Sequence, residues 1–399
     1  MPVASTSGAV APSLRILYHH RTRGEDAQGI HISEMIQAFR DLGHEVALVA
    51  LVKSKDERAP ARSASAWKWL TGWSPAWLYE LLSMGYNLYG YLRLRRAIAA
   101  RRPDLLYERY SLNTFCGIWA SRRFNIPLIL EVNAPLYHEQ RELGELVFQR
   151  LARFSERWIC SHSTKTVTVS HVLKEMLRQG GVPDTRLTVI PNGIDPRRFH
   201  RGISGEEIRR RYGLDGAVVV GFVGWFRPWH GLELLLQTLE RGTLTAPHVR
   251  LLLVGDGPAH PALRHYAQTH GLSSRIIFTG PVDRSDVAAH IAAMDIAVQP
   301  SVTAYACPMK IIEYMAMGKC VVAPDQPNIR EMLQDQINGQ LFQPWDLEQL
   351  AAALSRVIQE PDRRRELGEK ARQTIYERGY LWSANVARVI QLLPTQRPG

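Results

Sequence analysis

From residue 14 onward, the chain repeats one pattern: a short apolar run, a loop, and a segment with helical periodicity. LRILYHH, which starts at Leu14, is followed by a loop containing glycine and then by ISEMIQAFRDLG, whose apolar residues share one helical face. Gly43 stands where a helix C-cap is expected, and the apolar run HEVALVAL comes next. A buried strand, a loop, a helix and a second buried strand form the βαβ unit of a parallel sheet. We therefore predict an α/β fold.

The same rhythm restarts at AVVVGFVGW, from Ala217, after the polar stretch DPRRFHRGISGEE. We predict two doubly wound, Rossmann-like units with a boundary near residues 195–205. They should face each other across a cleft between the carboxyl ends of their sheets, where ligands of open α/β sheets bind. The predicted segments are a disordered N-terminus (1–13), a first domain (14–198) that the C-terminal helix (380–399) rejoins, and a second domain (199–379).

Composition narrows the class of protein. The 399 residues are 45% hydrophobic and 22% charged, which excludes a disordered chain, a disulfide mini-protein and a collagen-like fibre. The net charge of +11 indicates an anionic partner. The four cysteines form no CxxC pair, which is typical of reduced thiols in a cytosolic protein. Neither a signal peptide nor a stretch long enough to span a membrane is evident.

The segment SVTAYACPMKIIEYMAMGKCVVAP, residues 301–324, carries the sharpest local signal. It predicts a strand end, a loop, a short helix that starts near Pro308, and a further buried strand. The free amides around Pro308 and Met309, together with the Lys310 ammonium, would suit a diphosphate. Glu313 could accept hydrogen bonds from vicinal hydroxyls such as those of a ribose. The alternative is a Lys–Glu pair on a solvated helix face.

This segment resembles the donor-binding helix of family 4 glycosyltransferases, which are retaining enzymes with two Rossmann domains in the GT-B fold. EYMAMGKCVVAP matches the second half of the family's motif, with Glu313 as its second carboxylate. Tyr305 stands where the first Glu is usual, and ACPMKIIEYMA resembles a subgroup with an SPxKxxEYMA-like helix that also lacks it. Four further segments agree in order, so the resemblance spans roughly residues 14–380. It implies an acceptor-binding first domain and a donor-binding second domain.

In the second domain, the resemblance places further site residues in the loops that follow strands. In VGFVGWFRPWHGLELLL, Gly224 lies in such a loop, and Arg227 could contact phosphate oxygens in a bidentate manner. His230 replaces the family's usual Lys and could donate to the same group. The loop from Gly280 to Val282 would lie beside the nucleobase. For Arg227 the alternative is a surface arginine.

In the first domain, we expect the loop RTRGEDAQGIHISEM to bring Gly29 close to a phosphate or sugar, since glycine has no Cβ. His31 could contact the same ligand, or it could be a partly buried residue at a helix start. The loop EVNAPLYHEQRE offers Glu131, Asn133, His138 and Glu139, and Asn133 is favoured over His138 because it lies nearer the strand end. Glu108 and Arg109 should line the same edge.

The implied mechanism is transfer of a sugar with retention of configuration from a UDP- or GDP-linked donor. Lys310, Arg227 and helix amides would stabilise the leaving diphosphate, and Asn133 would act near the reacting sugar. The leaving phosphate oxygen can take the acceptor proton, so the scheme demands no protein nucleophile. The sequence contains no Asp-x-Asp, and we predict no metal requirement and no cofactor besides the nucleotide sugar.

Residues 60–103 combine aromatic and basic side chains. They contain Trp67, Trp69, Trp73 and Trp77, and seven Lys and Arg against a single acidic residue, Glu80. This composition suits an anionic membrane interface, where a polyprenyl- or lipid-linked acceptor would reside. The alternative is a helical pair whose aromatic residues pack on the first domain. We expect a cytoplasmic protein that associates peripherally with the inner face of the cytoplasmic membrane.

Several functions remain open at this point. The leading hypothesis is a glycosyltransferase of cell-surface polysaccharide or glycolipid synthesis, with a glycan or lipid-linked acceptor. A nucleotide-sugar epimerase or hydrolase could use the same scaffold, and a non-catalytic sugar-nucleotide-binding paralogue is a further alternative. Nucleic-acid binding is disfavoured, because the basic residues cluster with tryptophans and no nucleic-acid module is recognisable.

Overall fold

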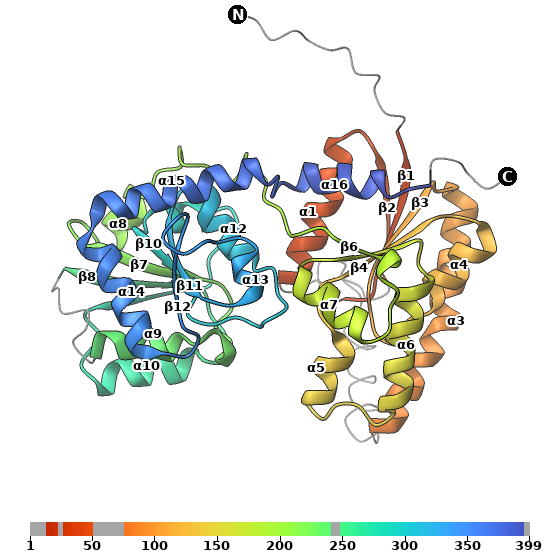
Figure 1. The fold of residues 1–399 in the computed structure, drawn as a ribbon, viewed down its shortest axis with the longest axis horizontal. Helices are drawn as coiled ribbons and strands as arrows, with labels where there is room; N and C mark the ends of the chain where they lie inside the picture. Colours follow the sequence, from red (N-terminus) through yellow and green to blue (C-terminus); the bar gives the residue numbers. More distant parts are fainter. Residues whose placement is uncertain (1–12, 23–26, 51–75, 241–247, 395–399) are drawn as a thin grey trace, which may run out of the picture. The chain divides into compact units, whose positions relative to one another are not determined.

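The computed structural model describes residues 13–22, 27–50, 76–240 and 248–394 (Figure 1). The chain divides into two compact units. Unit 1 comprises Met1–Thr168, Met176–Thr188 and Val386–Gly399, and unit 2 comprises Val169–Glu175 and Val189–Asn385. The N-terminal segment predicted to be disordered lies outside the described residues except for Ser13, as do Trp67, Trp69 and Trp73.

Unit 1 is built on a six-stranded sheet with the strand order β2-β1-β3-β4-β5-β6. The pairs from β2 through β5 are parallel, as the βαβ pattern predicts. Its strands are β1 (Arg15–His20), β2 (Glu45–Ala50), β3 (Leu105–Arg109), β4 (Leu128–Val132), β5 (Lys165–Thr168) and β6 (Leu187–Val189). Its helices are α1 (Ala27–Asp41), α3 (Ala76–Arg101), α4 (Cys116–Phe124), α5 (Leu136–Glu142) and α6 (Gln149–His162), with parts of α7 (His171–Gln179) and α16 (Trp382–Gln391).

Unit 2 contains a second six-stranded sheet, with the order β12-β11-β10-β7-β8-β9 and parallel pairing throughout. Its strands are β7 (Val218–Val223), β8 (Val249–Val254), β9 (Ile276–Gly280), β10 (Ile296–Val298), β11 (Cys320–Pro324) and β12 (Gln340–Phe342). Its helices are α8 (Glu206–Tyr212), α9 (Leu232–Glu240), α10 (His260–Thr269), α11 (Val287–Ala292), α12 (Met309–Ala316), α13 (Pro327–Arg330), α14 (Leu347–Gln359) and α15 (Pro361–Glu377). The prediction of two doubly wound α/β sheets is confirmed.

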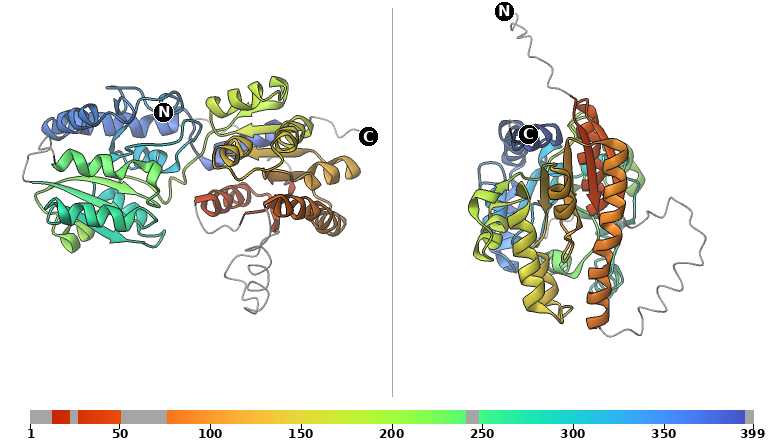
Figure 2. Two further views of the ribbon diagram at one scale, coloured as in Figure 1. Left: turned by 90° about the horizontal axis from the view of Figure 1, so that it is seen from below. Right: turned by 90° about the vertical axis from the view of Figure 1, so that its right-hand side faces the viewer.

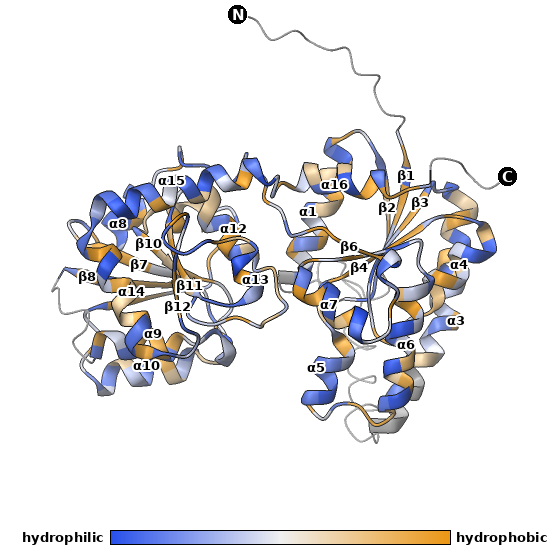
Figure 3. Cartoon of the chain, in the orientation of Figure 1, coloured by the Kyte–Doolittle hydropathy of each residue, from blue (hydrophilic) through white to orange (hydrophobic). Residues whose placement is uncertain are grey.

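Alternate strand residues build the core of unit 2. Val220 and Phe222 of β7, with Leu251 and Leu253 of β8, pack with leucines of α9, α10 and α14 in one buried cluster. Because successive residues of a strand point to opposite faces, such alternation buries one face under these helices. Figure 3 shows hydrophobic residues along the strands and hydrophilic ones on helices such as α5 and α8. This packing holds the ends of the strands in place, and those ends carry the polar residues.

Local signals set several element boundaries as predicted. The α12 helix begins directly after Pro308, and Gly318 adopts φ +68 just beyond its end. Gly43 has φ +84 and donates its amide to the Arg40 carbonyl two residues after α1. These glycines supply the left-handed conformation that closes a helix without a Cβ penalty.

Two segments of unit 1 differ from the predicted loops. The α1 helix starts at Ala27, so Gly29 lies in its first turn and not in a loop. The segment after Val132 was expected to be a loop, but Leu136–Glu142 forms helix α5 and carries His138. In both places the helix extends closer to the sheet edge than the apolar periodicity indicated.

Helix α3 is the longest element of unit 1, and Figure 2 shows it beside the strands of that unit. It packs against α4 and β1. In the described stretches, no helix combines the length and the apolar character needed to cross a membrane.

Candidate functional site

The strand order of unit 2 reverses between β7 and β10. In an open parallel sheet, the loops after two such strands diverge to opposite faces and leave a crevice for a ligand. The loop after β7 contains Gly224, Arg227 and His230, and the loop after β10 leads into α12 through Pro308. The residues predicted for the donor site therefore lie at the position where this topology favours ligand binding.

Lys310 and Gly224 meet at this point. The Lys310 Nζ atom lies 4.0 Å from the centre of the Phe222 ring. It is buried and has no hydrogen-bond partner among the residues that the structure describes. Gly224 has φ +140, and a Cβ on it would lie only 2.9 Å from Nζ. The absence of a side chain at Gly224 thus makes room for the ammonium.

Burial shifts the proton equilibria of two basic groups here. Desolvation lowers the pKa of Lys310 to about 7, against a smaller opposing effect of Glu313. Desolvation, followed by the charge of Lys310, lowers the pKa of His230 to about 3. His230 is therefore neutral at pH 7, and its Nδ1 atom has no partner in the described part of the chain. An incoming anion would favour the charged form of Lys310 and relieve the cost of its burial.

A clamp of glycines joins the loops after β7, β8 and β9. The Gly224 amide donates to Val254 O at 2.9 Å, and the Gly255 amide donates to Gly280 O at 3.0 Å. A Cβ on Gly255 would lie 2.1 Å from Gly224 O, and one on Gly257 would lie 2.5 Å from Phe226 N. Only glycine permits this approach of backbone to backbone. The clamp links predicted residues Gly224 and Gly280 and fixes the backbone beside Lys310.

The loop between β10 and α12 is tied down through its carbonyl oxygens. Asn328 Nδ2 donates to Thr303 O at 3.0 Å and to Ala306 O at 2.7 Å. Asn192 Nδ2 donates to Cys307 O at 2.6 Å. The first amides of a helix have no acceptor within it. With its carbonyls occupied, this loop presents the amides that open α12 to a ligand.

We expect Asn328→Asp to loosen this loop. The substitution replaces two buried N–H donors by a carboxylate that faces carbonyl oxygens, and the free energy of unfolding should fall by about 3 kcal/mol. Burial would raise the pKa of the new carboxyl, so the variant should regain stability as the pH falls toward 5. Urea unfolding at pH 7 and pH 5 measures both effects. Gln359→Glu, which makes the same change at an exposed position of α14, serves as control. Equal stability of the two variants at pH 7 would contradict the proposed tie.

The other predicted residues of unit 2 lie on α12 and in the loops after β7 and β9. Pro308 caps α12, and Met309 begins it. Arg227 lies directly before the short 3-10 turn Pro228–His230, and its guanidinium carbon is 5.2 Å from the centre of the exposed Trp229 ring. Val282 is half-buried in the loop after Gly280. Glu313 is half-buried one turn into α12.

In unit 1, predicted residues His31 and Asn133 converge on a third residue, Glu131. The Glu131 carboxylate is 2% exposed and accepts hydrogen bonds from Asn133 Nδ2 at 2.6 Å and Arg109 Nη1 at 2.9 Å on Oε1, and from Tyr107 OH at 2.6 Å on Oε2. His31 Nδ1 lies 3.3 Å from Glu131 Oε1. Donors from α1, β3 and the end of β4 therefore meet at one buried carboxylate.

The remaining predicted residues of unit 1 make no contact with this cluster within the described part of the chain. His138 is exposed on α5, with Nε2 3.1 Å from Glu142 Oε1 one helical turn away. Gly29 lies in the first turn of α1. Glu108 Oε2 shares a hydrogen bond with His19 Nδ1, and the two atoms lie 2.7 Å apart.

Sequence reasoning missed three residues that shape the site in unit 2. Gly255 and Gly257 follow β8 in VGDGP, and the close pair of glycines after a strand was a usable signal. Phe222 under Lys310 looked like any other core residue of a strand. In unit 1, Glu131 was among the candidates at the strand end, but nothing local showed that it is buried.

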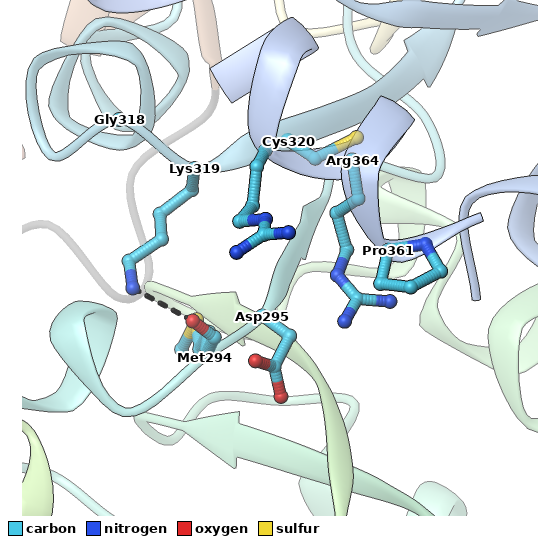
Figure 4. Close-up of a pocket in the computed structure, with 8 residues that line it drawn as sticks. Met294, Asp295, Gly318, Lys319, Cys320, Pro361 and Arg364 are labelled. Atoms are coloured by element: carbon cyan, nitrogen blue, oxygen red, sulfur yellow. Dashed lines mark hydrogen bonds between the residues drawn. The ribbon is translucent and has the colours of Figure 1, made fainter. Parts of the chain in front are cut away.

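A pocket of about 390 Å³ lies elsewhere in unit 2 (Figure 4). It is lined by the first turn of α15 and by residues at the amino ends of β10 and β11, whereas ligands of such sheets bind at the carboxyl ends. Lys319 Nζ donates to Ala292 O and Met294 O, each at 2.7 Å. Asp295 accepts hydrogen bonds from Arg209 Nη2 and from the Val219 amide. These groups are already satisfied within the fold.

No three His, Cys, Asp or Glu side chains come together as a metal-binding group within the described stretches.

Both halves of the chain match families of known proteins. Residues 28–198 match the family described as Glycosyltransferase Family 4, and residues 217–360 match Glycosyl transferases group 1. Two curated relatives are similar over about two thirds of the chain. They are an alpha-D-kanosaminyltransferase of Streptomyces kanamyceticus (25% identical, 70% of this chain and 73% of the relative) and a GDP-mannose-dependent alpha-mannosyltransferase of Mycobacterium tuberculosis (27% identical, 68% of each).

Among solved structures, Anabaena HepE in complex with UDP-glucose has a TM-score of 0.71 at 20% identity, covering 95% of this chain and 100% of that chain. A glycosyltransferase from Rickettsia africae has a TM-score of 0.73 at 16% identity, over 96% and 100%. At these identities the likeness concerns the fold, which is the two-domain GT-B architecture.

Proposed function

This chain is a glycosyltransferase with a GT-B fold, and from that premise we propose that it transfers a sugar, with retention of anomeric configuration, from a nucleoside-diphosphate donor to a glycan or lipid-linked acceptor. We further propose that unit 2 binds the donor and unit 1 the acceptor. The helix ACPMKIIEYMA would place the enzyme in the subgroup with an SPxKxxEYMA-like donor helix, acting in cell-surface polysaccharide or glycolipid synthesis.

The observation that carries this proposal is the unpaired ammonium of Lys310 at the topological switch point. A buried cation without a hydrogen-bond partner is costly unless a ligand supplies an anion. The diphosphate of a nucleotide sugar is such an anion. The amides that open α12 would bind the remaining phosphate oxygens. His230 could donate to them only in its protonated form, because its ring already donates to the Trp225 backbone.

In the proposed reaction, the bond between the anomeric carbon and the diphosphate oxygen breaks, and a bond from the acceptor oxygen forms on the same face. The acceptor proton passes to the leaving diphosphate. Negative charge on the diphosphate grows in the transition state. Lys310 and Arg227 would stabilise this charge without the reorientation that water molecules would need. We propose that these protein groups take the place of a metal ion, so that the reaction needs no cofactor besides the nucleotide sugar.

The test is a thermal-shift screen with UDP, GDP, ADP and their sugar conjugates. A ligand that binds only the folded state raises the melting temperature, by an amount that grows with the ratio of ligand concentration to Kd. We expect one nucleotide diphosphate to stabilise the protein with EDTA present. The stabilising donor is then incubated with and without candidate acceptors. A glycosylated product identifies a transferase, free sugar alone a hydrolase, and an isomerised donor an epimerase. No stabilisation by any nucleotide would overturn the proposal.

We also propose that unit 1 associates peripherally with an anionic membrane surface on the cytoplasmic side. The described outer face of α3 exposes Leu88, Tyr89 and Leu92 beside Arg93, Arg95 and Arg96. Apolar side chains flanked by arginines fit the boundary between acyl chains and anionic headgroups. Such attachment would bring the site to a lipid-linked acceptor.

Flotation with vesicles tests this attachment. Binding should be strong with vesicles containing phosphatidylglycerol and weak with phosphatidylcholine alone, and it should weaken with salt. Replacing Arg93, Arg95 and Arg96 together by Gln should reduce binding, whereas replacing Arg363 and Arg365 of α15 should not. Absence of flotation with anionic vesicles even at low salt would rule the attachment out.

A further inference from the structure

We infer that Glu131 is a positioning residue that orients the Asn133 side chain so that its carbonyl oxygen accepts a hydrogen bond from a sugar hydroxyl. This inference rests on the proposed transferase function and adds a residue and a ligand chemistry to it.

The geometry leaves the Asn133 amide one orientation. Its nitrogen Nδ2 lies 2.6 Å from Glu131 Oε1. The same Oε1 atom accepts a hydrogen bond from Arg109 Nη1. The NH₂ end of the Asn133 amide must therefore face it, because the reverse orientation would set two acceptors against each other. The Oδ1 end consequently points away from Glu131. It is buried and has no hydrogen-bond partner among the described residues.

Two further donors fix the position of the Glu131 carboxylate. Arg109 Nη1 lies 2.9 Å from Oε1, and Tyr107 OH donates to Oε2 at 2.6 Å. Arg109 is 8% exposed, so this is a buried, hydrogen-bonded ion pair. Such a pair holds the carboxylate in place, and with it the orientation of the neighbouring amide.

The unpaired Oδ1 atom of Asn133 determines which kind of ligand fits this site. A buried carbonyl oxygen without a donor costs about 1–3 kcal/mol, and a group that donates a hydrogen bond to it recovers that cost. Sugars present hydroxyl donors in quantity, whereas a diphosphate presents only acceptors at neutral pH. The site at the end of β4 therefore fits a hydroxyl of either the transferred sugar or the acceptor sugar.

A double-mutant cycle tests the inference. Glu131→Gln supplies an NH₂ in place of the carboxylate and allows the Asn133 amide to turn. Asn133→Ala removes the acceptor. We expect each variant to lower kcat for transfer by about tenfold to a hundredfold, with little change in stabilisation by UDP or GDP, and the double variant to be no slower than Asn133→Ala. Glu142→Gln, an exposed carboxylate on the following helix, is the matched control and should leave kcat unchanged.

The outcomes separate the alternatives. The inference would be overturned if Glu131→Gln lowered kcat by the same factor in the wild type and in Asn133→Ala, or if it did not lower kcat at all. If Glu131→Gln does not fold because Arg109 is left unpaired, Glu131→Gln/Arg109→Met removes both buried charges and replaces it in the cycle. Measuring sugar release to water alongside transfer locates the hydroxyl: a loss in both reactions assigns it to the transferred sugar, and a loss in transfer alone assigns it to the acceptor. A wild-type protein that binds no nucleotide would overturn the proposed function, and this inference with it. A wild-type protein that transfers sugar and a Glu131→Gln variant that is equally fast would overturn this inference alone.

Discussion

Lys310→Met is expected to abolish most of the transfer activity while making the unliganded protein more stable. The ammonium is buried above Phe222 with no hydrogen-bond partner in the described chain. Glu313 and the Phe222 ring offset only part of the free-energy cost of its burial, and an anionic ligand would offset the rest. Removing one preorganised charge from a developing oxyanion lowers kcat by about 10²–10³-fold. Methionine has a similar shape and no charge, and the free energy of unfolding at pH 7 should rise by on the order of 3 kcal/mol.

The pH dependence gives this prediction a second readout. The pKa of Lys310 is about 7 in the folded chain and about 10.4 for an unfolded lysine. Between these values the unfolded state binds more protons, so the stability of the wild type should rise as the pH increases from 7 toward 10. That rise should be smaller in Lys310→Met. Nucleotide affinity of the wild type should weaken over the same range, because the neutral amine no longer attracts the diphosphate.

Lys319→Met is the matched control for Lys310→Met. Lys319 is also buried, with a pKa lowered to about 8 mainly by desolvation, but its Nζ is hydrogen-bonded to two carbonyls. Its loss should destabilise the fold and leave kcat unchanged. A Lys310→Met variant that is less stable than the wild type and retains its turnover would refute the role given to the ammonium.

Gly255→Ala is expected to unfold or severely destabilise unit 2. The new Cβ would lie 2.1 Å from the Gly224 carbonyl oxygen, which is backbone and has no side-chain freedom to move away. Gly255 also has φ +126, which L side chains rarely adopt. Strain and overlap together should cost about 3–5 kcal/mol. Because the displaced carbonyl belongs to Gly224, the chain that folds should bind nucleotide poorly.

Gly271→Ala separates strain from overlap. Gly271 has φ +66, but a Cβ there would meet nothing within 4 Å. Its substitution should cost only about 1–2 kcal/mol and leave nucleotide binding intact. Urea unfolding of the two variants gives the difference, and thermal shift with the stabilising nucleotide reports the site. If both alanine variants are equally stable, the close approach of the two loops is not what demands glycine at 255.

The architecture could be predicted because its signals are local. Short apolar runs with intervening helical periodicity gave both parallel sheets, and Pro308 and Gly318 bounded α12 as expected. The helices α1 and α5 extend over segments predicted as loops, because polar residues near a strand end do not reveal whether the backbone is helical. Such boundaries depend on packing that the sequence pattern does not encode.

The candidate site was predictable only in part. Lys310 and Gly224 could be proposed from their motifs, but the burial of the ammonium depends on Phe222, nearly ninety residues earlier. Asn192 is separated from Cys307 by 115 residues, and no local pattern links the two. The role of Glu131 emerges only when α1, β3 and β4 come together. Contacts between segments far apart in the chain therefore complete the site, and local sequence patterns do not encode them.

The bond from Asn192 to the Cys307 carbonyl has a consequence for the chemical ageing of the protein. Asn192 precedes Gly193, and asparagine followed by glycine is the pair that deamidates most readily, since the next backbone nitrogen can attack the amide. Glycine is required there, because a Cβ would lie 2.6 Å from Trp382 N. In the folded chain the amide is 8% exposed and held at 2.6 Å, which keeps it from the attacking geometry. In the unfolded chain Asn192 can deamidate to aspartate, whose negative charge would face the Cys307 carbonyl oxygen after refolding. Each period of unfolding should therefore irreversibly weaken the loop that leads into α12.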